Sequence, residues 1–143
     1  MSEDGYLRLF YICGAVVLVA AFLIILVPSA SFQEAINNAP TFINGLTTST
    51  SIVVAFGGAV NGFMFREIVE GRDLEFRRRY FEGIGFFIVP PMEAWASYSF
   101  LAFGSTEFAV KLSLIGFLTA MLVLVTFYLF ISRELAHSGS ATR

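Results

Sequence analysis

An acidic residue inside an apolar stretch is the feature of this sequence that most suggests chemistry. Glu93 is the only acidic or basic residue between Gly83 and Phe103, and it lies in the middle of that stretch. A charge at the centre of a lipid bilayer costs at least about 2.5–3.5 kcal/mol, so a carboxyl group there is expected to hold its proton and is by default a functional candidate. Such a group is what a proton-coupled carrier or an ion relay requires.

Two prolines just before this acid sharpen the hypothesis. Pro90 and Pro91 have no amide hydrogen, so the carbonyl groups of Phe86 and Phe87 lose their α-helical partners. We therefore predict an interrupted helix, and the functional hypothesis is that its free carbonyls, together with Glu93, bind a cation, a water or the carboxyl proton. The alternative is structural, with the acid in the first turn of a new half-helix or hydrogen-bonded to a neighbouring helix. The structural alternative is favoured, because no other predicted span holds a charged partner for this acid.

Residue counts limit most other chemistry. The chain has one cysteine, Cys13, and one histidine, His137. A structural zinc site takes four Cys or His ligands and a haem commonly takes two axial ligands, so neither a metal site nor a cofactor is expected. The sequence also has no phosphate-binding loop and no recognisable nucleophilic constellation, and its net charge of -2 gives no support for nucleic-acid binding. A protein that is not an enzyme is the expectation.

The composition places the chain in a membrane. Of its 143 residues, 57% are apolar and 14% are charged, whereas soluble domains have about 45–50% and about 25%. A chain this small cannot hide so much apolar surface in its own core. Runs of about 20 apolar residues cross the bilayer as helices, because lipid offers backbone groups no hydrogen bonds. We predict a single all-α domain over residues 1–143 with four antiparallel transmembrane helices, at 9–27, 46–65, 83–103 (interrupted at Pro90-Pro91) and 112–132.

The distribution of basic residues predicts the orientation of these spans. Only Lys111, of nine basic residues, lies between spans one and two or between spans three and four. Loops rich in Lys and Arg stay in the cytoplasm, so both termini and the connection between spans two and three are predicted to be cytoplasmic, in the cell membrane. The other eight residues are Arg8, Arg66, Arg72, Arg77, Arg78, Arg79, Arg133 and Arg143.

The segment predicted to lie outside, residues 28–50, has no basic residue. Ser31 and Glu34 have the spacing of a capping box, which predicts a short helix that ends before Pro40. Its apolar face is expected to lie on the membrane surface or to cap the bundle.

The cytoplasmic connection, residues 66–82, is predicted to extend as a helix, with Gly71 separating it from span two. Its support is two acid-first i,i+4 pairs, Asp73 with Arg77 and Glu75 with Arg79. The basic residues Arg77, Arg78 and Arg79 either contact anionic lipid headgroups or an acidic partner, or only anchor the topology. The anchor is favoured, because neighbouring acids cancel most of their field. Four apolar or aromatic residues are expected at headgroup level: Leu74, Phe76, Tyr80 and Phe81.

Span two carries a face of small residues suited to helix packing. Its members recur at i,i+3 and i,i+4 spacing and include a small-xxx-small pair, which lets two helices approach closely; they are Ser51, Ala55, Gly58 and Gly62. Asn61 lies beside this face and is expected to hydrogen-bond across the contact. Trp95, near the middle of span three, is expected to pack beside the proline interruption.

These features predict a non-catalytic integral-membrane subunit that packs, within membrane lipid, against other transmembrane proteins or against copies of itself. The alternative is an oligomeric ion channel or proton-coupled transporter that uses Glu93. Four spans with one intramembrane acid resemble the small multidrug resistance transporters in outline. Those proteins carry the acid in their first span, whereas this chain has it in the third, so the resemblance assigns no family.

Overall fold

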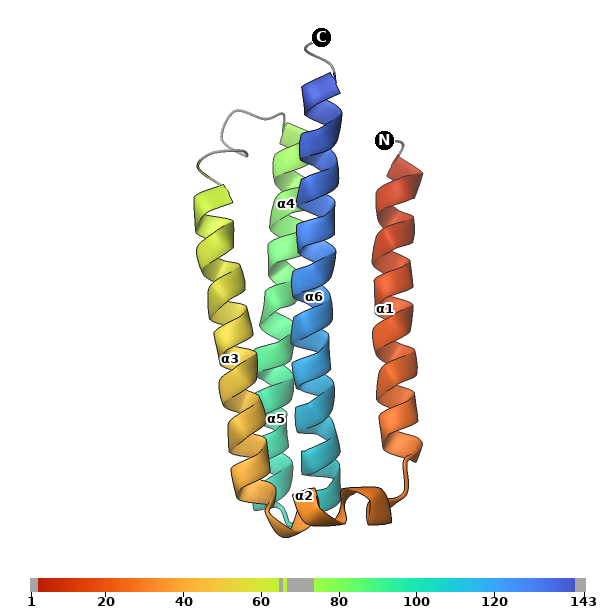
Figure 1. The fold of residues 1–143 in the computed structure, drawn as a ribbon, viewed down its shortest axis with the longest axis vertical. Helices are drawn as coiled ribbons and strands as arrows, with labels where there is room; N and C mark the ends of the chain where they lie inside the picture. The colour runs from red at the N-terminus through yellow and green to blue at the C-terminus, as the bar shows by residue number, and fades with distance from the viewer. Residues whose placement is uncertain (1–2, 65, 67–73, 141–143) are drawn as a thin grey trace.

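The computed structural model describes residues 3–64, 66 and 74–140 and is all-α in those residues. Three long helices lie side by side, and two further helices follow one another end to end beside them (Figure 1). Two short segments, η1 and α2, cross one end of the bundle and connect α1 to α3. The bounds are α1 Glu3–Leu26, η1 Ser29–Phe32, α2 Gln33–Asn37, α3 Ala39–Met64, α4 Leu74–Gly85, η3 Phe86–Ile88, α5 Val89–Ala102 and α6 Thr106–Ser140.

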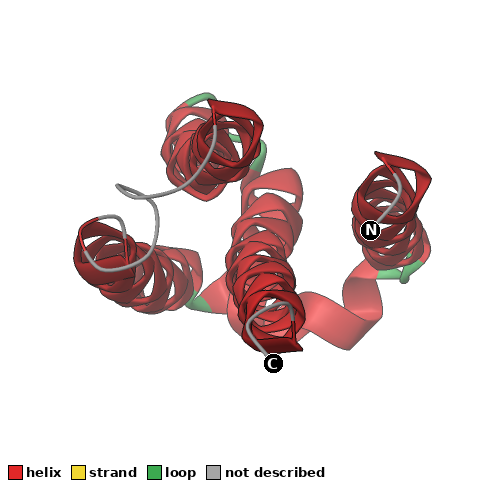
Figure 2. Cartoon of the chain, turned by 90° about the horizontal axis from the view of Figure 1, so that it is seen from above, coloured by secondary structure: helices red, strands yellow, loops and turns green. Residues whose placement is uncertain are grey.

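Helix α6 is the centre of the bundle. Helices α1, α3 and α5 all pack against it, and the view along the bundle shows it between them (Figure 2). Helix α1 packs mainly against α6 and stands apart from α3 (Figures 1 and 2). Much of its apolar surface is consequently exposed: Tyr11, Ile12, Val16, Leu18, Val19, Phe22, Leu23, Ile25 and Leu26.

Two helices are long and apolar enough to cross a membrane, Ala39–Phe63 of α3 and Thr106–Ser132 of α6. A third candidate joins Gly14–Leu26 to Ser29–Asn37, which are bent by 98° relative to each other. The described residues thus contain two to three candidate spans, against the four predicted. The predicted third span, residues 83–103, differs because it is divided among the end of α4, the 3₁₀ turn η3 and the 14-residue helix α5.

The interruption predicted at Pro90-Pro91 is a single 3₁₀ turn. Both prolines lie in the first turn of α5, where a missing amide hydrogen costs no helical hydrogen bond. The preceding residues Phe86–Ile88 form η3, and the Val89 amide donates to the Phe86 carbonyl. Helix α5 therefore continues along nearly the line of α4 (Figure 1).

The connection before α3 is shorter than predicted. Helix α2 ends at Asn37, before Pro40 as expected, but α3 begins at Ala39 rather than near residue 46. The expected capping box is absent, since neither η1 nor α2 has a side-chain cap at its N-terminus. The polar run at the start of α3 is helical, and its Ser49 and Ser51 hydroxyls donate to carbonyls four residues earlier, as serines in apolar surroundings commonly do.

Two apolar clusters occupy opposite ends of the bundle. One holds Tyr80, Phe87, Phe127, Phe130 and Ile131, with ring centroids of Tyr80 and Phe127 5.4 Å apart. The other holds Ala39, Ile43, Ala109 and Val110 near the crossing segments. Tyr80 is 0% exposed, so its side chain packs inside the bundle, and its level in the membrane stays a prediction. It is buried because α4 lies along the C-terminal half of α6.

Candidate functional site

The middle of the bundle, between the two apolar clusters, contains Glu93. The residue lies one turn into α5 and faces Gly116 of α6, where an added Cβ would be 3.2 Å from the Glu93 Cβ and 3.6 Å from its Oε2. The absence of a side chain at Gly116 is what lets the acid approach the α6 backbone. Oε2 is buried and has no hydrogen-bond partner among the described residues. A buried polar atom without a partner is costly, so its position needs a physical explanation.

Helix α6 offers this carboxyl group one polar neighbour. Thr119 lies within its reach, but the Thr119 hydroxyl donates to the Ile115 carbonyl at 2.9 Å. The threonine is buried, so the acid and the hydroxyl share a region closed to solvent. The carboxyl group is therefore enclosed by α6 without being satisfied by it.

The residues predicted to complete an ion site with Glu93 separate in the structure. Pro90 is buried, and the Phe86 side chain is exposed. The Phe86 carbonyl accepts the Val89 amide, so the expectation that it is free is wrong. The Phe87 carbonyl faces prolines at both the i+3 and i+4 positions and has no amide donor there. The Phe87 ring packs against Gly57 and, edge-on, against Phe127.

Two threonines of α3 are the polar residues that sequence reasoning missed. The hydroxyl oxygens of Thr47 and Thr50 are buried and have no hydrogen-bond partner among the described residues. Thr50 is only 2% exposed. Their i,i+3 spacing, which puts both on one helix face, was the available signal, but the surrounding serines and threonines concealed it.

The register of α3 against α5 places Thr50 at the depth of Glu93, with Thr47 one turn away. The Tyr98 hydroxyl donates to the Asn44 Oδ1 at 3.1 Å, and Gly57 contacts the Phe87 ring. Because the helices are antiparallel between these two contacts, the residues midway along each segment lie at one depth. Those residues are Thr50 on α3 and Glu93 on α5.

The small-residue face of α3 lies on the outside. Ser51, Ala55, Gly58 and Gly62 are all exposed, and an added Cβ at either glycine would meet nothing within 4 Å. Within the chain, the close contact is made at Gly57 instead. Packing of the small face against another protein stays a prediction.

Asn61, beside that face, is buried at the contact between α3 and α4. The Tyr80 hydroxyl donates to the Asn61 backbone carbonyl at 2.6 Å and lies 3.5 Å from its Oδ1. This bond fixes the two helices to each other next to the aromatic cluster. Tyr80 was the partner that the sequence did not indicate.

The basic stretch of α4 makes a local ion pair. Arg78 Nε donates to Glu82 Oε1 at 2.9 Å, and both side chains are exposed. Arg77 is also exposed. The predicted pair partner Asp73, the separating Gly71 and the side chains of Glu75 and Arg79 lie outside the described residues. Lipid or partner contact by Arg77, Arg78 and Arg79 stays a prediction.

Trp95 points away from the rest of the chain. It is 80% exposed, so the expectation that it packs beside the proline interruption is wrong. The residues of α5 that are buried are Pro90, Ala94 and Ser97 instead. The indole is left on the outer surface.

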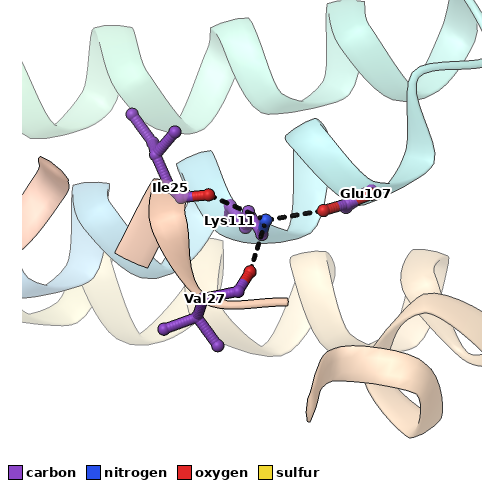
Figure 3. A network of polar contacts seen from close by, with 4 residues as sticks. All are labelled: Ile25, Val27, Glu107 and Lys111. Atoms are coloured by element: carbon purple, nitrogen blue, oxygen red, sulfur yellow. Dashed lines mark hydrogen bonds and ion pairs between the residues drawn. The ribbon is translucent and has the colours of Figure 1, made fainter. Parts of the chain in front are cut away.

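A second buried ionic group lies at the end of α1 (Figure 3). Lys111 Nζ donates to the carbonyls of Ile25 at 3.1 Å and Val27 at 2.9 Å, and to Glu107 Oε1 at 2.5 Å. Its side chain is 7% exposed, and the Phe32 ring centroid is 5.8 Å away. The last carbonyls of a helix lack internal donors and carry partial negative charge, so an ammonium group is a suitable cap.

No family model, curated protein or solved structure matches the chain. Function must therefore be argued from the sites themselves. Among the described residues, no group of three or more His, Cys, Asp or Glu side chains could hold a metal ion. Two features remain to be explained, the unsatisfied oxygens at mid-depth and the exposed faces of α1 and α3.

Proposed function

We propose that the protein is a non-catalytic integral-membrane subunit that packs laterally against other transmembrane segments, belonging to other proteins or to copies of itself. It crosses the membrane four times, with α4 and α5 contributing the third crossing and both termini in the cytoplasm. The observation that carries the proposal is the exposed small-residue face of α3, formed by Ser51, Ala55, Gly58 and Gly62. Helix association in lipid depends on close backbone approach, which such a face permits.

The surroundings of this face support a protein partner. Large side chains border it on one side, with Ile52, Phe56 and Phe63 all more than half exposed. A face of small residues beside bulky ones lets a second helix pack closely, whereas mobile lipid tails fill such a surface less completely. Helix α1 leaves further apolar surface uncovered on the other side of α6.

The test is the mass of the particle released from the native membrane by a mild detergent. Gly58→Leu covers the small-residue face from a position where an added Cβ meets nothing within 4 Å. We expect the wild type to elute as an assembly and the variant to lose its partners. Gly85→Leu, at an equally unobstructed glycine at the end of α4, serves as the matched control. A monomeric wild type, or a Gly58→Leu particle of unchanged composition, would refute the proposal.

A second candidate function is supported by the buried Glu93 Oε2, which lacks a partner. In this alternative, an oligomer of the chain conducts an ion or couples transport to a proton through that carboxyl group. Glu93→Gln is then expected to abolish pH-dependent flux in liposomes while leaving the fold intact, and unchanged flux would eliminate the role. If the acid is only structural, Glu93→Gln should be nearly silent and Glu93→Leu should destabilise by about 1 kcal/mol.

A further inference from the structure

We propose that Glu93, Thr50 and Thr47 bind one dehydrated monovalent cation, with sodium as the probe, in the middle of the bundle between α3, α5 and α6. The inference deepens the second candidate function and rests on it. Cation binding is nevertheless measured at equilibrium, without any flux. The proposed binding site and the proposed transport function can therefore fail separately.

The first support is the clustering of unsatisfied oxygens. Three buried side-chain atoms lack a hydrogen-bond partner among the described residues: Thr47 Oγ1, Thr50 Oγ1 and Glu93 Oε2. The register set by the Asn44–Tyr98 bond and the Gly57–Phe87 contact brings Thr50 to the depth of Glu93. Thr47 lies one turn along the same face, about 4.5 Å further in helix rise. A single unpartnered group would be an accident of packing, but Thr50 and Glu93 at one depth, with Thr47 one turn away on the same face, indicate a shared ligand.

The second support is the room that α6 leaves for the acid. Gly116 gives the carboxyl group access to the α6 backbone, and Thr119, which is buried, lies within its reach. The Thr119 hydroxyl already donates to the Ile115 carbonyl. A donating hydroxyl keeps its lone pairs, so the Thr119 oxygen can offer the site only an acceptor. Hydroxyl and carboxylate oxygens are acceptors that a hard cation binds.

The charges around the site fix the valence of the ligand. Helix α3 has no acidic or basic residue, and α6 has none between Lys111 and Arg133. The Lys111 ammonium is engaged by two α1 carbonyls and Glu107. Among the described residues of the helices that enclose the site, Glu93 is therefore the only charged group at this depth. One carboxylate balances one positive charge, and a divalent ion would leave an uncompensated charge in a medium of low dielectric constant.

The donor atoms fix the class of cation. Carboxylate and hydroxyl oxygens are hard ligands that suit hard ions and not soft ones. The described residues at this depth provide no thiolate or imidazole. A small alkali cation fits both the charge and the ligands, and a proton on Glu93 is its natural competitor.

The experiment uses a carbodiimide that modifies protonated carboxyl groups in apolar surroundings. The full chain in detergent micelles is treated at one pH in sodium chloride and in choline chloride of equal ionic strength, and labelling of Glu93 is followed by peptide mass spectrometry. We expect sodium to suppress the labelling. In Thr50→Val, which removes one oxygen ligand, the sodium concentration for half-protection should rise about tenfold. Thr48→Val makes the same change at an exposed threonine of α3 and should leave protection unaltered.

A second measurement does not depend on access of the reagent. Sodium, relative to choline, should raise the melting temperature of the wild type, because a ligand stabilises the state that binds it. The same substitution of salts should leave the melting temperature of Glu93→Gln unchanged. Glu34→Gln, at an exposed acid of α2, is the control that must keep the sodium response.

Two results would overturn the inference. Equal labelling in sodium and choline would mean that a proton or a water satisfies the three oxygens, and an equal rise in melting temperature for the wild type and Glu93→Gln would mean that sodium acts elsewhere. If Glu93 is not labelled in either salt, the melting temperatures decide whether sodium binds at Glu93. Sodium binding without flux would support this site and eliminate the transport function. Flux without sodium binding would support the transport function and eliminate this site.

Discussion

Gly57 and Gly58 are neighbours in sequence with opposite surroundings, and their replacement by alanine tests the packing of α3 directly. A Cβ on Gly57 would clash with Cε1 of the Phe87 ring and lie 3.0 Å from its Cζ. A Cβ on Gly58 would meet nothing within 4 Å. The ring cannot simply swing aside, because Phe87 is buried and its centroid lies 5.7 Å from that of Phe127.

The expected difference follows from two opposing terms. Alanine gains about 1 kcal/mol over glycine in a helix interior, and this gain applies equally at both positions. Overpacking a filled contact costs about 1–3 kcal/mol, and this cost applies only at Gly57. Gly58→Ala should therefore be about 1 kcal/mol more stable than the wild type, and Gly57→Ala should unfold about 1–3 kcal/mol more easily than Gly58→Ala.

The assay is reversible unfolding in mixed micelles, with the free energy of unfolding compared at fixed detergent composition. Shortening the facing ring should relieve the clash, so adding Phe87→Leu should cost less in the Gly57→Ala background than in the wild type. Equal unfolding free energies for Gly57→Ala and Gly58→Ala, within about 0.5 kcal/mol, would refute the close contact between α3 and η3.

Two other contacts give testable outcomes. Tyr80→Phe removes the 2.6 Å bond to the Asn61 carbonyl. It should lower the free energy of unfolding by about 1–3 kcal/mol, because it leaves a buried acceptor without a donor. Tyr128→Phe, at an exposed tyrosine, should not change this free energy, and an equal effect of the two substitutions would count against the bond. Lys111→Met should release the end of α1 and increase proteolysis just after that helix. Arg78→Met, at an exposed residue, should not increase proteolysis there. Unchanged cleavage in the Lys111 variant would show that α1 is held by other contacts.

The helical class was readable from the sequence, because long apolar runs leave the backbone no partner but itself. The packing of α4 against α6 was not predicted, because Arg77, Arg78 and Glu82 made the stretch look interfacial. The charged residues occupy only part of the helix, and Phe76, Tyr80 and Ile84 recur every fourth residue on the face that meets the aromatic cluster. This apolar periodicity was present in the sequence and outweighs the local charge.

The contacts of single residues on α3 were beyond the sequence. Gly57 and Gly58 differ by one position, which turns a side chain by about 100° around the helix and separates a buried contact from the outer surface. Only the placement of Phe87 decides which glycine is needed. Glu93 was identified because a charged residue in an apolar run is rare. Thr47 and Thr50 were missed because threonines are common in such runs.

Lys111 is the one basic residue that conflicts with the charge distribution, and its environment removes the conflict. A lysine guides topology when its charge is free to resist transfer across the membrane. Here the ammonium group is bound by Glu107 and by two carbonyls at the negative end of α1, and its side chain is nearly buried. The Glu107–Lys111 pair carries no net charge, so the first turns of α6 are in effect uncharged. The lysine is therefore better explained as the cap that attaches α1 to α6 than as a signal against cytoplasmic termini, and Lys111→Met should leave the proposed orientation of terminal tags unchanged while releasing α1.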